Sequence, residues 1–404
     1  MNTQFFIPAN RYNIMLNVTD ACNLECRYCF VSQHPHFMSL EVAKDTVDFF
    51  NDIISKSDKN ESNQKGNKRR FNINFFGGEP TLCWDSIIVP LINYTEEKDY
   101  NIHFGMTSNC TLLDDEKIKF MKEHKMSLLF SIDGDKQTQD YNRPCHNHNI
   151  SSFDMLEPNL DKIIESFPDT TFRSTLIPET CQNMMSNILF AYSKGFRHYF
   201  ACPDDFNQGW TEDAISKLEK EVYKASLYFI DSFSSPEKQA NRMELSFLEK
   251  ELRSVKEWKR KANENIVSKT AGSMCGLGKA SFCVNWEGAI FGCQETPSYG
   301  YNDNHHYIGN IYTGYDKDKF DNLVNSYSEK EIIGEDPSLC SECTYRFLCN
   351  KGFCHANSYL RFGNENTKSR IRCIWDSLLI KYSLFIVDTL KENTLFQKEF
   401  KNIC

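Results

Sequence analysis

The stretch Val18-Thr-Asp-Ala-Cys-Asn-Leu-Glu-Cys-Arg-Tyr-Cys-Phe30 contains three cysteines, Cys22, Cys26 and Cys29, in a CxxxCxxC spacing. An apolar, β-branched run at residues 13–18 precedes it and predicts a strand, so the cysteines belong to a loop at the carboxyl end of that strand. Active sites of barrel folds gather at this end of the strands. The sequence therefore predicts a chemical site in this loop.

The three thiols suit an iron–sulfur cluster better than zinc. Three thiolates hold a cubane cluster and leave its fourth iron without a protein ligand, so that another molecule can bind there. A structural zinc site usually takes four closed ligands, and no local histidine supplies the fourth. A zinc knuckle and three unrelated buried thiols are the alternatives. Tyr28, between the last two cysteines, could lay its aromatic face against a nucleobase.

The first half of the chain alternates short apolar or β-branched runs with helical patterns, which is typical of a parallel α/β architecture. Six strand–helix repeats predict a partial, TIM-like (β/α)6 barrel. The first helix has Ser39 as its N-cap residue. Strands are expected at residues 13–18, 71–76, 101–106, 127–132, 171–176 and 197–201, and further helices at 113–124, 159–166 and 183–194.

The residue composition of the sequence changes twice after the region predicted to form the barrel. Residues 211–270 form a charged, helix-favouring stretch that includes 237–261, and the following part is rich in Gly, Cys and short strand-like runs before a helix at 375–391. A chain of 404 residues is long enough for two domains. We expect a core at residues 1–210, a helical connector at 211–270 and a Cys-rich α+β domain at 271–404.

Composition narrows the classes of function. The net charge of -9 and the pI near 5.7 argue against a protein that grips nucleic acid through its phosphates. No signal peptide and no apolar run of about 18 residues is present, so we expect a cytoplasmic protein without a membrane partner. Because reducing compartments disfavour disulfides, the 17 cysteines point to metal binding where they cluster.

Further motifs follow the next strands. Gly77-Gly78-Glu79-Pro80 comes after the second strand and Ser108-Asn109 after the third, while Ser131 ends the fourth and Arg143 follows it. Together with the cysteine loop, this order resembles the radical SAM (S-adenosylmethionine) superfamily over residues 13–143. The resemblance implies a 4Fe-4S cluster on the loop cysteines and SAM on its free iron.

The resemblance also assigns roles to the motif residues. Gly77, Gly78, Glu79 and Pro80 would contact the SAM amino group, through a backbone carbonyl or the Glu79 carboxylate. Ser108 and Asn109 would lie near the ribose, where Cys110 replaces the glycine common in the family. Ser131 and Arg143 would hold the SAM carboxylate by charge-assisted bonds, and Arg173 is a weaker candidate for the same region. Asp133 is expected either in this region or simply as a turn residue or helix cap.

A second set of cysteines occupies the C-terminal part, with spacings that resemble the SPASM extension of radical SAM peptide-modifying enzymes. That extension supports two auxiliary 4Fe-4S clusters, which would bring the total to three. Four residues separate Cys349 from Cys354, where the family usually has three, and Cys283 is an additional candidate ligand. A zinc ribbon is the alternative. The resemblance assigns Cys340, Cys343, Cys349 and Cys373 to the distal cluster, and Cys275, Cys293 and Cys354 to the nearer one.

SPASM enzymes include anaerobic sulfatase-maturating enzymes and maturases of ribosomally made peptides. In the former, an Asp base follows the cysteine matched by Cys293, whereas this chain has Gln294 and then Glu295 as candidates. This departure favours a maturase that installs a crosslink in a Cys-containing precursor peptide. A thioether is the preferred type of crosslink. A carbon–carbon cyclase, a formylglycine-forming enzyme and a zinc-binding interaction protein are the alternatives. Flavodoxin or ferredoxin would donate electrons, and nucleic acid is not an expected partner.

We expect no winged-helix domain for peptide recognition before the cysteine loop. Only 21 residues precede Cys22, too few for the winged-helix leader-binding domain of many peptide maturases. We therefore expect leader recognition, if there is any, to use the core, the connector, the polar and basic segment at residues 56–70, or a separate partner. A solvated loop is the alternative for residues 56–70.

Overall fold

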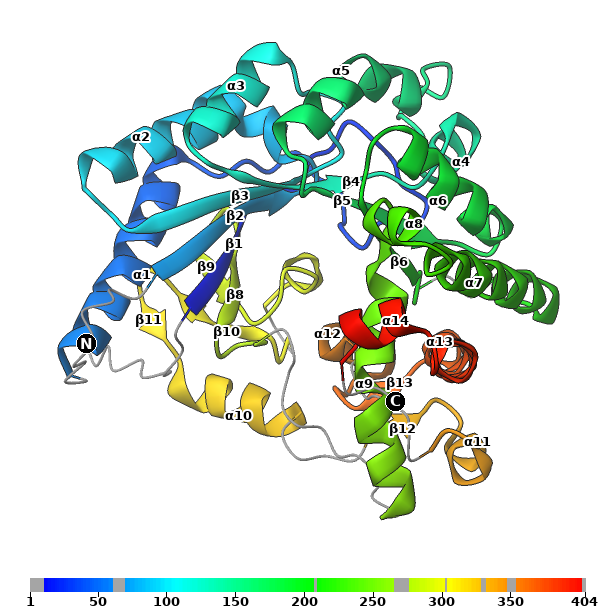
Figure 1. Ribbon diagram of the computed structural model, residues 1–404. Helices are drawn as coiled ribbons and strands as arrows, with labels where there is room; N and C mark the ends of the chain where they lie inside the picture. Colours follow the sequence, from blue (N-terminus) through cyan, green and yellow to red (C-terminus); the bar gives the residue numbers. More distant parts are fainter. Residues whose placement is uncertain are drawn as a thin grey trace. The chain divides into compact units, whose positions relative to one another are not determined.

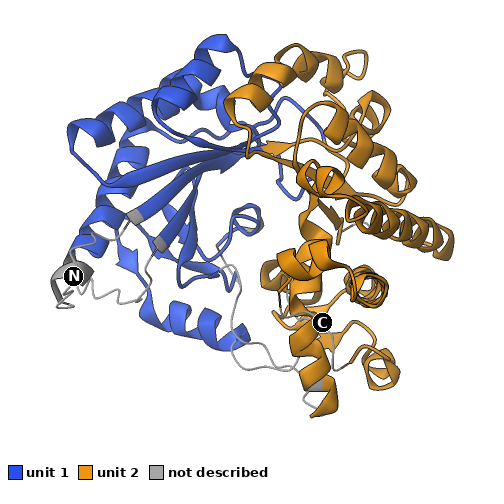
Figure 2. Ribbon diagram, in the orientation of Figure 1, with its two compact units in different colours: residues 1–25, 29–129, 272–328 blue, residues 26–28, 130–271, 329–404 orange. Residues whose placement is uncertain are grey.

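The computed structural model describes residues 11–60, 70–206, 209–264, 276–301, 304–327, 332–346 and 354–401. The chain divides into two compact units, which are coloured separately in Figure 2. Unit 1 comprises Met1–Glu25, Cys29–Leu129 and Gly272–Ser328, and unit 2 comprises Cys26–Tyr28, Phe130–Ala271 and Glu329–Cys404. The domain boundaries expected from the sequence stay a prediction. Most of the basic segment at residues 56–70 lies outside the described residues.

Unit 1 is built on a sheet with the strand order β11-β10-β9-β8-β1-β2-β3. The strand β1 pairs in parallel with both β2 and β8, and β2 pairs in parallel with β3. The remaining pairs are antiparallel. The strands are β1 (Arg11–Thr19), β2 (Arg70–Gly77), β3 (Ile102–Ser108), β8 (Ser281–Val284), β9 (Ala289–Phe291), β10 (Tyr307–Asn310) and β11 (Gly314–Tyr315).

Helices follow the strands of unit 1 and cover one face of β1–β3 (Figure 1). The first begins after Ser39, whose hydroxyl accepts a hydrogen bond from Val42 N at 3.1 Å, as expected for an N-cap. The turns at Pro80–Cys83 and Trp84–Ile88 lead into a helix that the sequence analysis missed. The helices are α1 (Leu40–Asn60), α2 (Val89–Glu97), α3 (Asp115–Glu123) and α10 (Lys317–Tyr327).

Unit 2 continues the alternation of strands and helices. Its strands follow the order β4-β5-β6-β7, all parallel where the pairing is described, and β12 pairs with β13 separately. The strands are β4 (Ser127–Ser131, of which the last two residues belong to unit 2), β5 (Thr171–Leu176), β6 (His198–Pro203), β7 (Glu244–Leu245), β12 (Ile333–Gly334) and β13 (Thr367–Lys368).

The helices of unit 2 include the segment expected as a connector. There, α7 and α9 both pack against α13, near the end of the chain. The helices are α4 (Lys136–Asn142), α5 (Ser152–Ser166), α6 (Met184–Ser193), α7 (Glu212–Ser232), α8 (Pro236–Ala240), α9 (Ser246–Asn263), α11 (Pro337–Glu342), α12 (His355–Phe362), α13 (Arg370–Leu390) and α14 (Thr394–Glu399).

The expected fold class is confirmed: the chain is an α/β protein whose six expected strands all form, each followed by a helix. Two local expectations were wrong. The helical stretch at 237–261 is interrupted by β7, and the helix expected from residue 159 begins at Ser152 and runs through Pro158. Among the described residues, no helix has the length and apolar character needed to cross a membrane.

Candidate functional site

The cysteine loop leaves β1 as predicted, and its first sulfur has donors directed at it. In unit 1, Cys22 Sγ accepts hydrogen bonds from Leu24 N at 3.4 Å and from Asn109 Nδ2 at 3.9 Å. Cys22 and Cys26 are half-buried and Cys29 is exposed. N–H groups that point at sulfur stabilise a thiolate and tune a bound cluster. The loop thus suits metal-bound thiolates better than buried thiols.

Backbone hydrogen bonds hold the Gly77–Pro80 motif against the start of this loop. Gly78 N donates to Thr19 O and Glu79 N to Ala21 O, both at 2.9 Å. Gly77 has φ +144, and a Cβ there would lie 1.9 Å from Thr19 O. Only glycine permits this approach. The sequence predicted the motif's position, and its glycines are explained by the close packing.

The Glu79 carboxylate is buried and fully engaged by the protein. It accepts hydrogen bonds from Thr81 N at 3.1 Å, Thr81 Oγ1 at 2.6 Å, Ser108 Oγ at 2.8 Å and Asn109 N at 2.8 Å. Burial raises its pKa, and these four hydrogen bonds partly offset that effect. Of the two expected contacts with a SAM amino group, the backbone carbonyl is therefore favoured over this carboxylate.

Two further features of unit 1 surround the motif. Cys110, the residue that replaces the family's glycine, has φ +61, a left-handed conformation that costs a non-glycine residue about 1–2 kcal/mol. Asn17 Oδ1 is buried and accepts no hydrogen bond from the described residues. It would lie 2.6 Å from a Cβ at Gly77. An unsatisfied buried acceptor beside this motif fits a bound group that brings its own N–H donors.

Unit 2 contains a second polar centre, which gathers on Asp133. This carboxylate, 0% exposed, accepts from Tyr28 OH at 2.7 Å, from Thr175 N at 2.9 Å and from Arg143 Nη2 at 3.2 Å. Burial of the hydroxyl raises the pKa of Tyr28. Burial would lower the pKa of Arg143, but Asp133 and its neighbours hold it above its usual value. Asp133 is therefore neither a simple turn residue nor the cap of α4, because Asp135 caps that helix.

The same centre changes the expected environment of three site residues. The Arg143 guanidinium lies 5.3 Å from the centre of the Tyr28 ring, so it covers the face expected to meet a nucleobase. The guanidinium donates a hydrogen bond to Asp133, whereas Ser131 lies on β4 in register with Arg173 on β5. Arg173 is exposed. The importance of Asp133 was missed because its partners come from segments far apart in the sequence.

The candidate catalytic residues lie in unit 1, after β9. Cys293 is 9% exposed, and its thiol donates to Gln294 Oε1 at 3.7 Å. Gln294 and Glu295 are half-buried. Cys283 is different: it is 0% exposed, packed with Ala289 and Phe291, and burial raises its thiol pKa. This environment favours a small core residue at position 283 rather than a cluster ligand.

Three cysteines of the second, C-terminal set line one cavity in unit 2. Cys340 and Cys343, at α11, and Cys373, on α13, border a space of about 260 Å³. Gly334 N donates to Cys340 Sγ at 3.2 Å. A Cβ at Gly334 would lie 3.0 Å from Cys340 Sγ and 3.7 Å from Cys373 Sγ, so the glycine keeps both sulfurs accessible. Thiols, a backbone N–H donor and free volume together fit a cluster.

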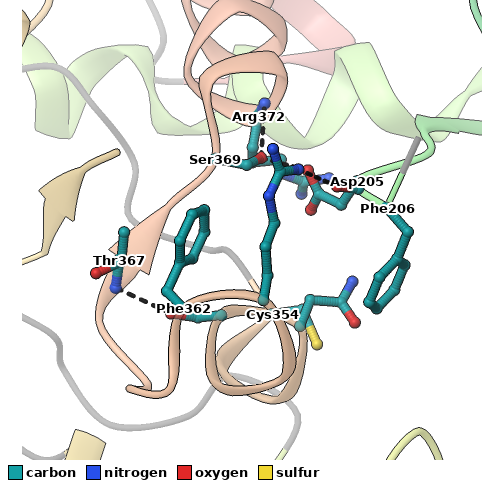
Figure 3. A pocket seen from close by; sticks show the side chains of 10 residues that line it. Asp205, Phe206, Cys354, Phe362, Thr367, Ser369 and Arg372 are labelled. Atoms are coloured by element: carbon teal, nitrogen blue, oxygen red, sulfur yellow. Dashed lines mark hydrogen bonds between the residues drawn. The ribbon is translucent and has the colours of Figure 1, made fainter. Parts of the chain in front are cut away.

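Cys354 lines a separate, smaller pocket of unit 2, shown in Figure 3. There the Ser369 hydroxyl donates to the carboxylate of Asp205, in the loop after β6. The assignment of Cys354 to another cluster stays a prediction. Cys275 and Cys349 lie outside the described residues. Within the described residues, no three His, Cys, Asp or Glu side chains are arranged closely enough to enclose a metal ion as they stand.

The fold and these motifs define a class of protein: an α/β barrel enzyme with a cysteine loop after its first strand. Residues 16–190 match the model of the radical SAM superfamily. This part of the chain is similar to that superfamily.

The relatives differ in how much of the chain they share. A cysteine-type anaerobic sulfatase-maturating enzyme of Clostridium novyi is 24% identical over 87% of this chain and 89% of its own length. The radical SAM cyclopropyl synthase TigE of Paramaledivibacter caminithermalis is 26% identical over 36% of this chain, and the match spans only 33% of TigE. This chain is also similar to a solved structure of native anSMEcpe with bound AdoMet and Cp18Cys peptide. The match covers 95% of this chain and 99% of the anSMEcpe chain, with 17% identity and a TM-score of 0.67.

Proposed function

We propose that this chain is a radical SAM/SPASM peptide maturase that installs a crosslink in a ribosomally made, Cys-containing precursor peptide. Among the possible crosslinks, a thioether is the preferred one. The observation that carries the proposal is the cavity lined by Cys340, Cys343 and Cys373, which adds a second thiol site to the radical SAM domain. Related proteins act on peptides or proteins, as their names state. Gln294 stands where the resemblance places the Asp base of sulfatase maturases, and this departure disfavours a sulfatase-maturing function without eliminating it.

Each residue group would have a defined task. Cys22, Cys26 and Cys29 would hold a 4Fe-4S cluster, and SAM bound to it would supply the 5′-deoxyadenosyl radical that removes a hydrogen atom from the peptide. The carbonyls of Gly77 and Gly78, with Asn17, would accept from the SAM ammonium. Ser108 and Asn109 would lie near the ribose. Further contacts would come from Tyr28, Pro80, Ser131, Arg143 and Arg173, with Glu79 holding the motif in place.

Two auxiliary clusters would complete the cofactors. Cys340, Cys343, Cys349 and Cys373 would hold one, and Cys275, Cys293 and Cys354 the other. An auxiliary cluster could accept the electron released when the substrate radical is oxidised, or bind a substrate thiolate at an open iron. Glu295 or Gln294 would assist proton removal. A low-potential donor such as flavodoxin or ferredoxin would supply the starting electron in a cytoplasmic setting.

The test is anaerobic turnover with candidate precursor peptides, followed by tandem mass spectrometry. Formation of a thioether crosslink removes two hydrogen atoms from the peptide and retains the cysteine sulfur. Fragmentation of the peptide then locates the new bond. Heat-inactivated enzyme and the Cys26→Ala variant are the controls. Formation of 5′-deoxyadenosine with no peptide that loses hydrogens would overturn the proposal.

A second candidate function is formylglycine formation on a sulfatase. The match to the Clostridium novyi enzyme over 89% of that protein favours it, and Glu295 could serve as the base. The two functions differ in product, since formylglycine replaces the thiol or hydroxyl by an aldehyde that hydrazide reagents trap. An aldehyde without a crosslink would select this second function.

A further inference from the structure

The two faces of the unit 1 sheet have different side chains. Residues on β1 and β2 that pack toward α1–α3 are apolar, and Ile14, Ile73 and Phe75 are at most 1% exposed. Their alternate neighbours Asn13, Asn72 and Asn74 are half-buried on the other face, because successive residues of a strand point to opposite sides. In closed barrels this inner face is filled by bulky branched residues. Here it carries amides.

The amides hold one another in place. Asn13 and Asn72 are register partners, and Asn72 Nδ2 donates to Asn13 Oδ1 at 2.8 Å. Asn74 Nδ2 donates to Thr107 Oγ1 of β3 at 3.0 Å. Among the described residues, Oδ1 of Asn72 and of Asn74 accept no hydrogen bond. The face therefore presents fixed acceptors with remaining hydrogen-bonding capacity.

A glycine on β3 leaves room for this arrangement. Gly105 is the register partner of Asn74, and a Cβ there would lie 2.8 Å from Asn74 Oδ1. The φ of Gly105 is not positive, so its backbone conformation does not require glycine. The absent side chain instead leaves space for the amide of Asn74. Gly105 thus lets the Asn74 side chain lie against β3, where it remains half-buried.

We propose that the amide face formed by Asn13, Asn72 and Asn74 binds backbone amides of an extended segment of the substrate peptide. An asparagine side chain offers one donor and one acceptor group, like a peptide bond. Asn72 and Asn74 are two residues apart, or about 6.7 Å along a strand, which matches alternate peptide groups of an extended chain. These three side chains are uncharged, so they suit amides rather than phosphates. The inference rests on the proposed function and specifies how its substrate is held.

The test uses the holoenzyme with Asn72→Leu and Asn74→Leu, singly and together, because leucine keeps the branching at Cγ and removes both hydrogen-bonding atoms. One neutral hydrogen bond contributes about 1 kcal/mol, so we expect the peptide KM to rise roughly fivefold per residue. SAM cleavage without peptide should be unchanged. Asn93→Leu, at an exposed position of α2, is the matched control and should leave KM unaltered. Asn74→Asp keeps the shape if a Leu variant fails to fold.

A substrate change supplies the second arm. Methylation of successive backbone nitrogens in the peptide should weaken binding to the wild-type enzyme at one or two positions, with a smaller further loss in the double Leu variant. Unchanged KM and equal N-methyl effects in the double variant would overturn the amide face. Wild-type enzyme that cleaves SAM but modifies no peptide would instead overturn the proposed function, so the two failures are distinguishable.

Discussion

The two thiol sites of this chain are built differently. In the loop after β1, all three cysteines lie within eight residues, so chain connectivity alone brings them together. In the cavity of unit 2, Cys340 and Cys373 come from α11 and α13, and β12 supplies the Gly334 N–H that points at sulfur. The first site can be read from local spacing, whereas the second depends on tertiary packing. Substitutions should therefore affect the two sites in different ways.

The largest effect is expected from Cys26→Ala in the loop. Two remaining thiolates cannot hold the cubane, so SAM cleavage should fall by at least about a thousandfold, the scale seen when an essential active-site group is removed. The loss of about four irons per chain, measured after anaerobic reconstitution, should accompany it. Cys181→Ala, at a buried cysteine outside both sites, is the control. Full SAM cleavage by Cys26→Ala would contradict the assignment.

Replacing both Cys340 and Cys373 by alanine should separate the two sites. We expect a loss of about four irons, because the two thiolates that remain cannot hold that auxiliary cluster, with SAM cleavage in the absence of peptide retained. Formation of peptide product should fall by about a hundredfold or more, since the oxidised product requires an electron acceptor. Unchanged iron content would show that the cavity of unit 2 binds no cluster, and would leave the zinc ribbon as the better interpretation.

Glu79→Gln tests how firmly the motif is held beside the loop. The amide can still accept one set of donors, but its NH2 group would face Asn109 N, which is itself a donor. The cost of an unsatisfied buried donor is about 1–3 kcal/mol, measurable by denaturant unfolding of the anaerobic protein. The KM for SAM should also rise. Glu123→Gln, at an exposed carboxylate of α3, is the control and should change neither quantity.

The sequence predicted local features well and long-range partners poorly. The spacing of Cys22, Cys26 and Cys29 and the position of Gly77 at the end of β2 required only nearby residues. By contrast, Asp133 acquires its importance through Tyr28, from which it is separated by 105 positions. The role of Gly105 likewise depends on a side chain of the neighbouring strand. Such contacts follow from the register and packing of the strands, which no local pattern reports.

The smallest effect concerns a cysteine that belongs to neither site. Burial raises the pKa of Cys83 to about 11, so at pH 8 its thiol stays protonated, whereas loop thiols freed of iron should react. Iodoacetamide treatment of the folded, iron-free protein, read by peptide mass spectrometry, should label Cys29 and spare Cys83.

Raising the pH toward 11 should increase the labelling of Cys83, since its thiolate fraction grows. Because the unfolded thiol loses its proton near pH 9 and the folded one near 11, the contribution of Cys83 to stability should fall across that window. Rapid labelling of Cys83 at pH 8 would mean that this residue is accessible like the loop thiols. The contrast between clustered, accessible cysteines and scattered, buried ones would then no longer hold.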